Sequence, residues 1–335
     1  MFNTLKKTSL AILVASTAFM QFSCNNDDKD ADKLGNWYRQ GIPDFGGSPR
    51  QGAVSFVIGE KGYIGTGRSS EVNAYKKDMW SFTGKTWTQV AEFPGTGRSH
   101  ATSFVINNKA YVGTGYDNNT LVDNGYKKDF YEYDPATNKW KAIADFPSLR
   151  RHASAFALGT KGYVGLGSVD NSTLYQDFFS YDPTSNKWEE VATFTGGKRH
   201  GANAFVLGGK AYVGFGQNNS QLSTKDMYVF DPAANGWSRL EASNDNLTAR
   251  SFAFSLVVNE KAYIIGGTSA SDVWQYEAGT NTWTQMNNFE GGARSSAAGF
   301  TLGGIGYLGT GLAGSANSDD LWAFDPAAAV NSDDN

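Results

Sequence analysis

Six cationic side chains recur about every fifty residues along this chain of 335 residues, each shortly before an apolar stretch: Arg50, Arg98, Arg150, Lys198, Arg250 and Arg294, with Arg151 and Arg199 beside two of them. A guanidinium group offers a planar fork of N–H donors that matches a carboxylate or a phosphate. Gathered around one opening, such groups would bind an anionic ligand. Bonded to loop carbonyls and packed against a neighbouring repeat, the same groups would only hold the fold together. The residue types leave both uses open.

The chain has three histidines, and each follows one of these cations by two residues: His100, His152 and His200. The corresponding positions in the other repeats are Gly52, Phe252 and Ser296. A metal site needs ligands that converge on one point, which equivalent positions of separate repeats do not readily do. We therefore expect no metal and no other cofactor. Packing and hydrogen bonding are the expected roles, with proton transfer by one imidazole as a lesser alternative.

The elements that position these residues repeat with the same period. Aligning the tyrosine of the second apolar run in each repeat gives Tyr63, Tyr111, Tyr163, Tyr212, Tyr263 and Tyr307. In the second repeat we predict four strands, because the apolar runs are short and rich in aromatic and β-branched residues. They are 100–106, 110–113, 129–133 and 139–143, and an Asp-Pro turn separates the last two.

Each repeat is therefore a four-stranded antiparallel meander, and such a sheet buries both faces only when copies stack. The recurring order of Arg, apolar strand, Tyr-Val-Gly-x-Gly, Asp-aromatic and Asp-Pro-x-x-Asn-x-Trp resembles the kelch repeat. This resemblance implies an all-β fold, a six-bladed β-propeller, over residues 35–326. The Gly-Gly doublet of that family survives only at Gly266-Gly267, and elsewhere the chain has Gly-x-Gly.

The ends of the chain explain how the ring closes. The sixth repeat stops near Pro326 without a fourth strand, and a small polar tail follows over 327–335. The missing strand lies at the other end, where Asn36-Trp37-Tyr38-Arg39 matches the pattern around Trp140. We predict that this N-terminal strand completes the C-terminal blade.

The first strand of a propeller blade is innermost, so the six cations should crowd the mouth of the central channel. The loops between the second and third strands share this face and are rich in Asn, Asp, Ser and Tyr, as at Tyr116 and Asp117. Amides and hydroxyls beside flat aromatic rings suit a carbohydrate or a protein partner.

Two further sets recur in every repeat, which indicates packing rather than one ligand site. They are the fourth-strand tryptophans Trp37, Trp87, Trp140, Trp188, Trp237 and Trp283, and the aspartates Asp78, Asp129, Asp177, Asp226, Asp272 and Asp320.

The N-terminus has the features of an exported lipoprotein. Lys6 and Lys7 precede a short apolar run, which indicates a signal peptide over residues 1–23. Cys24, the one cysteine, follows it and resembles a lipidation site; an acidic tether is expected over 24–34. These features predict an outer-membrane lipoprotein that faces the periplasm or the cell surface, with ordinary secretion as the alternative. Without Lys6 and Lys7 the chain has 27 basic and 33 acidic residues, which argues against nucleic acid as a partner.

We expect a monomeric, non-catalytic recognition propeller that binds a carbohydrate or a partner protein at the channel mouth. Kelch propellers include the central domain of galactose oxidase, whose copper site needs a Tyr–Cys cross-link, and here the one cysteine lies outside the repeats. The resemblance also extends to six-bladed sialic acid mutarotases or epimerases, which act on an acidic sugar through Arg, His and Glu. That activity is the alternative function, although this chain shows no set of glutamates near the cations.

Overall fold

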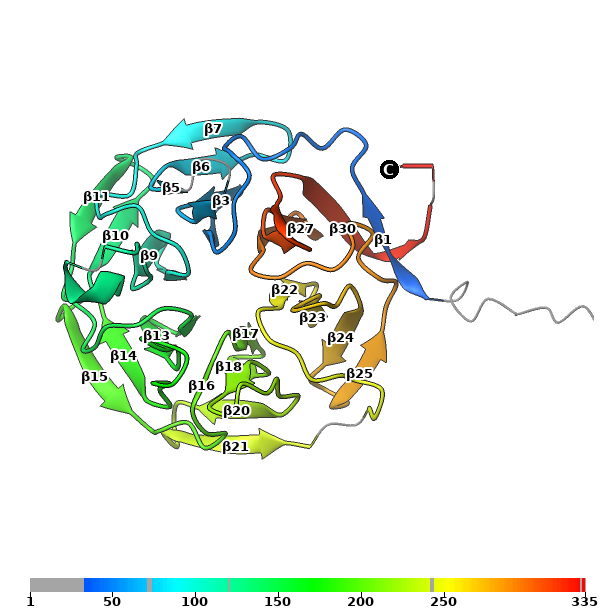
Figure 1. Cartoon of the computed structure of the whole chain (residues 1–335). Helices are drawn as coiled ribbons and strands as arrows, with labels where there is room; N and C mark the ends of the chain where they lie inside the picture. The colour runs from blue at the N-terminus through cyan, green and yellow to red at the C-terminus, as the bar shows by residue number, and fades with distance from the viewer. Residues whose placement is uncertain (1–32, 71–73, 120, 242–243, 332, 335) are drawn as a thin grey trace, which may run out of the picture.

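The computed structural model describes residues 33–334 except 71–73, 120, 242–243 and 332, and within them the chain forms a closed ring of six four-stranded sheets (Figure 1). The predicted all-β six-bladed propeller is confirmed. Residues 1–23 and Cys24 lie outside the described part, so the predicted signal peptide and lipid anchor stay predictions. Among the described residues, no helix is long and apolar enough to cross a membrane.

Each blade is an antiparallel meander that begins at the axis and ends at the rim. The strands of blades 1 to 3 are β2 (Val54–Ile58), β3 (Lys61–Gly65), β6 (Met79–Phe82) and β7 (Trp87–Val90); β8 (Thr102–Ile106), β9 (Lys109–Gly113), β10 (Phe130–Asp134) and β11 (Lys139–Ala142); and β12 (Ser154–Leu158), β13 (Lys161–Gly165), β14 (Phe178–Asp182) and β15 (Lys187–Val191).

Blades 4 to 6 repeat this order, except that blade 6 takes its outer strand from the N-terminus. Their strands are β17 (Asn203–Leu207), β18 (Lys210–Gly214), β20 (Met227–Asp231) and β21 (Gly236–Leu240); β22 (Phe254–Val258), β23 (Lys261–Ile265), β24 (Val273–Glu277) and β25 (Thr282–Gln285); and β26 (Ala298–Leu302), β27 (Ile305–Gly309), β30 (Leu321–Ala329) and β1 (Leu34–Tyr38).

Short elements in the loops of the channel-mouth face complete the described structure. They are the pairs β4 (Arg68–Ser69) with β5 (Ala74–Tyr75), β16 (Arg199–His200) with β19 (Gln217–Asn218) and β28 (Leu312–Ala313) with β29 (Ala316–Asn317), and a 3-10 turn, η1 (Asp123–Gly125).

The pairing of β1 with β30 closes the ring, as predicted. Trp37 lies opposite Phe324, and Tyr38 lies opposite Ala323. Strand β30 continues to Ala329, which pairs with Leu34, so the sheet extends three residues beyond the expected end at Pro326. Beyond it the carbonyl oxygen of Asp334 accepts hydrogen bonds from the backbone N–H groups of Arg39 and Gln40. Part of the segment expected to be a free tail is therefore bound to the first strand.

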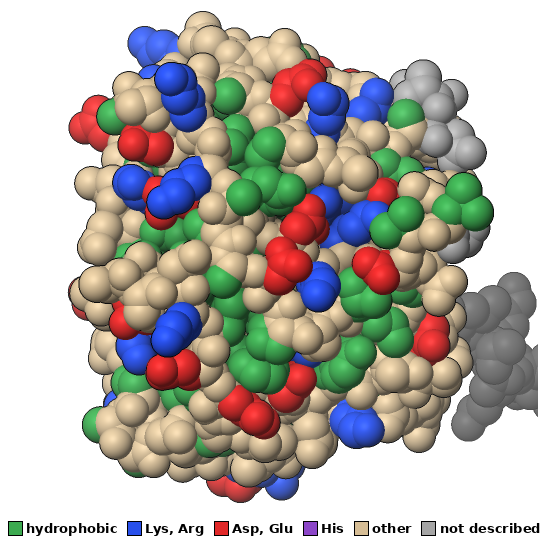
Figure 2. Space-filling model, turned by 90° about the vertical axis from the view of Figure 1, so that its left-hand side faces the viewer, with side chains coloured by type: hydrophobic (Ala, Val, Ile, Leu, Met, Phe, Trp, Pro, Cys, Tyr) green, Lys and Arg blue, Asp and Glu red, His purple; other side chains and the backbone are tan. Residues whose placement is uncertain are grey.

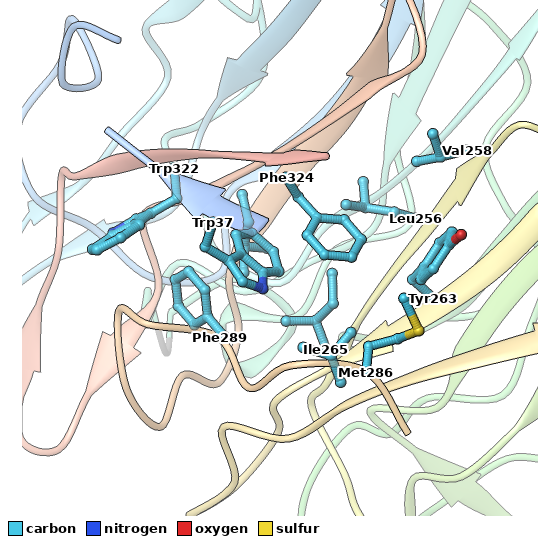
Figure 3. Packing of buried hydrophobic residues seen from close by; sticks show 11 residues of the cluster. Trp37, Leu256, Val258, Tyr263, Ile265, Met286, Phe289, Trp322 and Phe324 are labelled. Carbon is cyan, nitrogen blue, oxygen red and sulfur yellow. The ribbon is translucent and has the colours of Figure 1, made fainter. Parts of the chain in front are cut away.

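The hydrophobic core is divided into six clusters, each between adjacent blades. In the cluster between blades 5 and 6, Trp37 is fully buried and stacks on Phe324 with a centroid distance of 4.4 Å (Figure 3). Phe289 meets the edge of the same indole at 4.6 Å. Blades approach so closely that Gly62 has no room for a side chain, since a Cβ there would lie 2.4 Å from the ring of Phe300.

Interblade packing also uses the recurring tryptophans. The indole N–H groups of Trp140, Trp188 and Trp237 donate to the carbonyl oxygens of Ala91, Ala144 and Ala192 in the preceding blades, at 2.9–3.0 Å. On the rim in Figure 2, acidic and basic side chains are interspersed, and none of the three histidines is visible.

Candidate functional site

The recurring arginines form buried ion pairs within the blades instead of an open ring of charge. Each guanidinium group makes two hydrogen bonds, of 2.5–3.0 Å, to the aspartate at the start of the third strand. The pairs are Arg50–Asp78, Arg98–Asp129, Arg150–Asp177, Arg199–Asp226, Arg250–Asp272 and Arg294–Asp320. All six arginine side chains are at most 3% exposed. These groups hold the fold together and are not open to a ligand.

The fourth member of this set is Arg199 and not Lys198, which is a correction of the sequence alignment. Lys198 is exposed, whereas Arg199 is buried and bonded to Asp226. The guanidinium carbon of Arg199 lies 5.0 Å from the ring centre of Phe194, five residues earlier. Arg98 and Phe93 have the same spacing and a distance of 4.7 Å. In these two blades the buried arginine follows the phenylalanine by five residues, but in blade 3 the spacing is four, from Phe146 to Arg150, so spacing alone does not identify the buried arginine.

The Gly-x-Gly motif of each blade contacts two of the recurring arginines, one in its own blade and one in the next blade. The carbonyl oxygen of the middle residue accepts a bond of 2.8–3.2 Å from the guanidinium group of its own blade. The N–H group of the second glycine donates to the carbonyl oxygen of the arginine in the next blade, at 2.7–2.9 Å. Both residues have positive φ angles, as at Thr114 (59°) and Gly115 (102°). The middle residue and the second glycine thus take the place of the Gly-Gly doublet of the kelch repeat.

A closed circle of backbone hydrogen bonds surrounds the channel axis. It joins the residues two positions after the six arginines: Gly52, His100, His152, Gly201, Phe252 and Ser296. The N–H group of each residue donates to the carbonyl oxygen of its counterpart in the preceding blade, at 2.8–3.3 Å, and all six have φ angles between 51° and 62°. We call these six residues the axial circle. It contains His100 and His152, and Gly201 stands in the place predicted for His200.

The axial circle surrounds a cavity of about 160 Å³. Six alanines, one after each member of the circle, complete its wall: Ala53, Ala101, Ala153, Ala202, Ala253 and Ala297. A second cavity of about 330 Å³, lined in part by Ser55, Ser103 and Ser255, lies next to it and shares Ala53 and Ala101. The channel therefore has a small compartment at the axial circle and a more polar one beside it.

The three histidines gather at this compartment, although they occupy two different positions in the repeat. The ring centres of His100 and His152 lie 4.0 Å apart, and those of His152 and His200 lie 5.4 Å apart. Phe252 meets the edge of His152 at 5.0 Å. Neither ring nitrogen of His152 has a hydrogen-bond partner, and both nitrogens are buried. His152 therefore carries an unpaired donor and an unpaired acceptor, both shielded from solvent.

The hydrogen bonds of His200 determine which of its nitrogens carries the proton. The Gln217 side chain donates through Nε2 to the carbonyl oxygen of Gln221, so its Oε1 faces Nε2 of His200 at 2.9 Å. That oxygen can only accept, and the proton of His200 must be on Nε2. Nδ1 then accepts from the hydroxyl group of Ser168 at 2.9 Å. His200 is thus held as a neutral imidazole.

Arg151 is the cation that faces this cluster. Its guanidinium carbon lies 5.1 Å from the ring centre of Tyr116 and 5.6 Å from that of Tyr126. Among the described residues, no carboxylate lies within ion-pair distance of Arg151, and its Nε has no hydrogen-bond partner. The ring centres of Tyr75 and Tyr116 lie 6.0 Å apart in a T-shaped arrangement. The guanidinium carbon of Arg68 lies 5.8 Å from the ring centre of Tyr75. We call Arg68, Tyr75, Tyr116, Tyr126 and Arg151 the mouth belt.

The comparisons with known proteins fit this geometry. A family model described as KLHDC2/KLHL20/DRC7 Kelch-repeats domain matches residues 98–267, half of the chain, and a Kelch motif model matches residues 249–290. The chain belongs to the kelch-repeat family. A solved structure titled "Structure of YjhT" superposes with a TM-score of 0.71 at 19% identity, over 84% of this chain and 95% of that chain. That likeness shows the shared fold alone, and no curated protein sequence matches the chain.

Asp117 of this kelch propeller is neutralised within its own loop. Its carboxylate lies 2.8 Å from the ammonium group of Lys127, and both side chains are at most 10% exposed. Burial raises the pKa of Asp117, but its hydrogen bonds to Lys127 and to the backbone of Asn119 outweigh that effect and lower it overall. Tyr116, by contrast, faces Arg151. Of these two predicted ligand-binding residues, only Tyr116 belongs to the mouth belt.

Several residues of the site had no clear signal in the sequence. In the sequence Arg151 is only an additional cation beside Arg150, and Arg68, Tyr75 and Gln217 are contributed by loops that vary between the repeats. The sequence does offer one signal for Arg151, the pattern Arg150-Arg151-His152. Each repeat has a single recurring aspartate, so one of two adjacent arginines is left without an aspartate partner. Within the described residues, no three His, Cys, Asp or Glu side chains converge as metal ligands.

The environment of the histidines keeps them uncharged. Burial, followed by the charge of Arg151, lowers the pKa of His100 to about 3. The pKa of His152 lies well below 6.5, because of burial and then the neighbouring charges of His100 and Arg151. Burial and Arg151 also lower the pKa of His200, although its bond to Gln217 opposes them. The cluster therefore presents neutral donors and acceptors next to a permanent cation.

These shifts predict a loss of stability in mild acid. His100 and His152 bind protons near pH 6.5 in the unfolded chain but only at much lower pH when folded. Unfolding thus takes up protons, and the free energy of unfolding should be greatest above pH 6.5 and fall as the pH decreases. Each histidine contributes up to about 1.4 kcal/mol per pH unit. Urea unfolding from pH 7 to 4.5 measures this slope.

Asparagine is the matched replacement, because it is neutral and tolerates the positive φ angle of the axial circle. The double variant His100→Asn/His152→Asn should lose most of the slope between pH 6 and 5. An equal slope in the variant and the original protein would contradict the assignment of neutral, buried imidazoles.

Proposed function

We propose that this kelch propeller is a non-catalytic recognition protein that binds an acidic carbohydrate at the channel mouth. The observation that carries the proposal is Arg151. It is a permanent cation whose guanidinium carbon lies 5.1 Å from the ring centre of Tyr116 and 5.6 Å from that of Tyr126, with no carboxylate partner among the described residues. A guanidinium group in this setting keeps its N–H donors in one plane, where a carboxylate binds with two parallel hydrogen bonds.

The groups around Arg151 suit the rest of a sugar. Tyrosine rings and Phe252 offer flat surfaces for the apolar face of a pyranose. The nearby carboxylate of Asp117 is neutralised by Lys127, so it does not repel an anion. Positive charge without a compensating acid, next to neutral polar groups, favours a singly or doubly charged sugar over a neutral one.

Isothermal titration with acidic and neutral monosaccharides tests this proposal. Glucuronate or N-acetylneuraminate should bind, and glucose and N-acetylglucosamine should bind at least tenfold more weakly. The variant Arg151→Gln should lose a further factor of about ten to a hundred for the acidic sugar, as expected for one charged hydrogen-bonded contact. Its urea unfolding curve should stay close to that of the original protein, because Arg151 belongs to none of the six buried pairs.

Lys198→Gln is the matched control, since it removes one positive charge from an exposed side chain that also adjoins a buried arginine, in the next blade. It should leave binding within a factor of two. Equal binding by Arg151→Gln and the original protein would overturn the proposal. So would binding only to a protein partner, with no acidic sugar bound at millimolar concentration.

The location outside the cytoplasm is part of this proposal and rests on the N-terminal sequence. Cys24 after an apolar run supports lipidation, which would tether the ring to a membrane through residues 24–34. Labelling of growing cells with a palmitate analogue should mark the protein and should fail for Cys24→Ser. A labelled Cys24→Ser protein would rule out this anchor.

The second candidate is the acidic-sugar mutarotase or epimerase, and one observation favours it. His152 follows Arg151 directly and its ring nitrogens have no hydrogen-bond partner, so it is the imidazole that could accept a proton beside an anion-binding group, although its low pKa makes it a weak base at neutral pH. Exchange spectroscopy by NMR on N-acetylneuraminate separates the two functions. Acceleration of anomer exchange that is lost in His152→Asn would identify the enzyme. Binding without acceleration supports recognition alone.

A further inference from the structure

The loops between the second and third strands form a crown around the channel mouth, and blade 5 interrupts this crown. In the other five blades the loop has 11 to 16 residues, from 310–320 in blade 6 to 114–129 in blade 2. In blade 5 it has seven, 266–272. Because the reach of a chain segment grows with its number of residues, the short loop projects less far above the ring. The wall of the mouth is therefore lowest at blade 5.

Backbone pairing shows the same interruption. Each of the five longer loops folds back on itself as a short ribbon, with the pairs Arg68 with Tyr75, Tyr116 with Tyr126, Ser168 with Leu174, Gln217 with Ser223 and Leu312 with Asn317. The structure describes all seven residues of the blade 5 loop, and none of these pairs with another in this way. A tight turn replaces the ribbon, in which the N–H group of Ala270 donates to the carbonyl oxygen of Gly267 at 3.3 Å. We call this interruption of the crown the gap.

The gap lies opposite the mouth belt. Blades 2 and 5 are three blades apart in a ring of six, so they face each other across the axis (Figure 1). Tyr116 and Tyr126 belong to the loop of blade 2, and the guanidinium group of Arg151 lies beside both rings. The mouth is therefore bordered by aromatic rings and a cation on one side, and its wall is lowest on the other side.

Phe252 connects these two sides. It is the axial-circle residue of blade 5 and is only partly buried. Its ring centre lies 5.0 Å from that of His152, the residue after Arg151, and 5.4 Å from that of His200. Beyond it, Thr268 is exposed in the loop of blade 5. The surface from Arg151 to the gap thus includes a partly exposed aromatic ring, which suits the apolar face of a second sugar.

We infer that the channel mouth binds an oligosaccharide lengthwise: an acidic unit lies at Arg151, and the neighbouring units pass over Phe252 and leave through the gap above blade 5. This inference rests on the proposed function and extends its ligand from one sugar to a chain of several. The ribbons of the other blades stand in the way of a chain that crosses the ring in another direction. Affinity should therefore increase with the length of the chain.

Isothermal titration with glucuronate, alone or linked to one, two or three neutral sugars, tests this inference. The charge of these ligands stays constant while their length changes. Both orders of linkage are used, with the acidic unit at the reducing or at the non-reducing end. In at least one order, the affinity should rise by about tenfold or more from free glucuronate to the trisaccharide.

Exchange of the blade 5 loop closes the gap. Residues 217–224 of blade 4 replace 268–270, and the two segments end at equivalent places. The carbonyl oxygens of Thr224 and Ala270 accept from the backbone N–H groups of Arg250 and Arg294, respectively. This variant should bind glucuronate within a factor of about two of the original protein and should lose the gain with length. The same eight residues in place of 312–318, a loop that already forms a ribbon, are the matched control and should leave the gain intact.

Phe252→Ser is the second variant and leaves every loop unchanged. Serine is tolerated there, because Ser296 occupies the equivalent position with a similar positive φ angle. This variant should also lose most of the gain with length. A gain that survives in either variant, with a urea unfolding curve of a folded protein, would overturn the inference and leave the proposed function intact. So would equal affinity for all lengths in the original protein. Failure of every acidic ligand, free glucuronate included, would overturn both.

Discussion

Replacing Arg150 by alanine should lower the free energy of unfolding by about 3–5 kcal/mol, because it leaves a half-buried carboxylate without its partner. The Arg150 side chain is fully buried and makes two hydrogen bonds to Asp177 and one to the carbonyl oxygen of Leu166. Its guanidinium carbon also lies 4.5 Å from the ring centre of Phe146 and 4.2 Å from that of Tyr175. The substitution therefore breaks contacts between the first strand, the Gly-x-Gly turn and the start of the third strand. Urea unfolding monitored by tryptophan fluorescence measures the loss.

Two control variants separate the effect of the paired hydrogen bonds to Asp177 from the effect of the positive charge alone. Arg150→Lys keeps the charge but not the two parallel bonds, and it should still cost about half of the alanine effect. Lys198→Ala should change stability by less than about 0.5 kcal/mol, because Lys198 is exposed and lies outside the pairs. Equal effects of Arg150→Ala and Lys198→Ala would contradict the structural role given to the buried arginines.

Replacing Trp37 by alanine should destabilise the protein as much as Arg150→Ala, because Trp37 anchors the strand that closes the ring. Trp37→Ala removes a fully buried side chain that stacks on Phe324 and contacts Phe289, and such truncations cost about 3–5 kcal/mol. The residue belongs to the strand that joins the N-terminus to β30, so the variant also weakens the connection between the ends of the chain. Thermal unfolding should show a marked decrease in the midpoint.

A variant of the neighbouring Tyr38 provides the comparison. Tyr38 is only half-buried and pairs with Ala323 at the same edge, so Tyr38→Ala should cost much less than Trp37→Ala. A protein that begins at Gly46 lacks β1 altogether and should fail to form a stable monomeric ring. If that shortened protein unfolded at the same temperature as the full chain, closure by the N-terminal strand would not contribute to stability.

The fold could be predicted because every repeat carries the same local signals. Apolar runs around the six recurring tyrosines, Asp-Pro turns and a tryptophan near the end of each unit all specify one four-stranded sheet. The pattern around Trp37 identified the exchanged strand for the same reason. The extension of β30 to Ala329 carried no such signal, because Ala327, Ala328 and Ala329 have weak preference for a strand and pair only because β1 continues alongside.

The site was predicted less well, because its properties depend on contacts between loops. The six cations were assigned to the mouth from their place in the repeat, yet the aspartates draw them into the blades. Lys198 and Arg199 are adjacent basic residues that the repeat pattern does not distinguish, and only the buried pair of Arg199 with Asp226 shows which of them belongs to the set. Of the predicted ligand-binding residues, the structure brings together His100, His152, His200 and Tyr116 at the mouth.

The same limits apply to Arg151. Its importance comes from what surrounds it, namely two tyrosines of a variable loop and the absence of an acidic partner among the described residues. Neither property is visible in a single repeat. The unpaired nitrogens of His152 likewise follow from the packing of rings around the axial circle.

The most direct test uses the three histidines, which all lie at the channel mouth and are the only imidazoles in the chain. Their side-chain NMR signals therefore report on this site alone. On titration with N-acetylneuraminate or glucuronate at pH 7, we predict that the signals of His152 and His200 shift with saturation, and that Arg151→Gln abolishes the shift while the spectrum stays that of a folded protein. Binding of either sugar by calorimetry without movement of any histidine signal would place the ligand elsewhere and contradict the account.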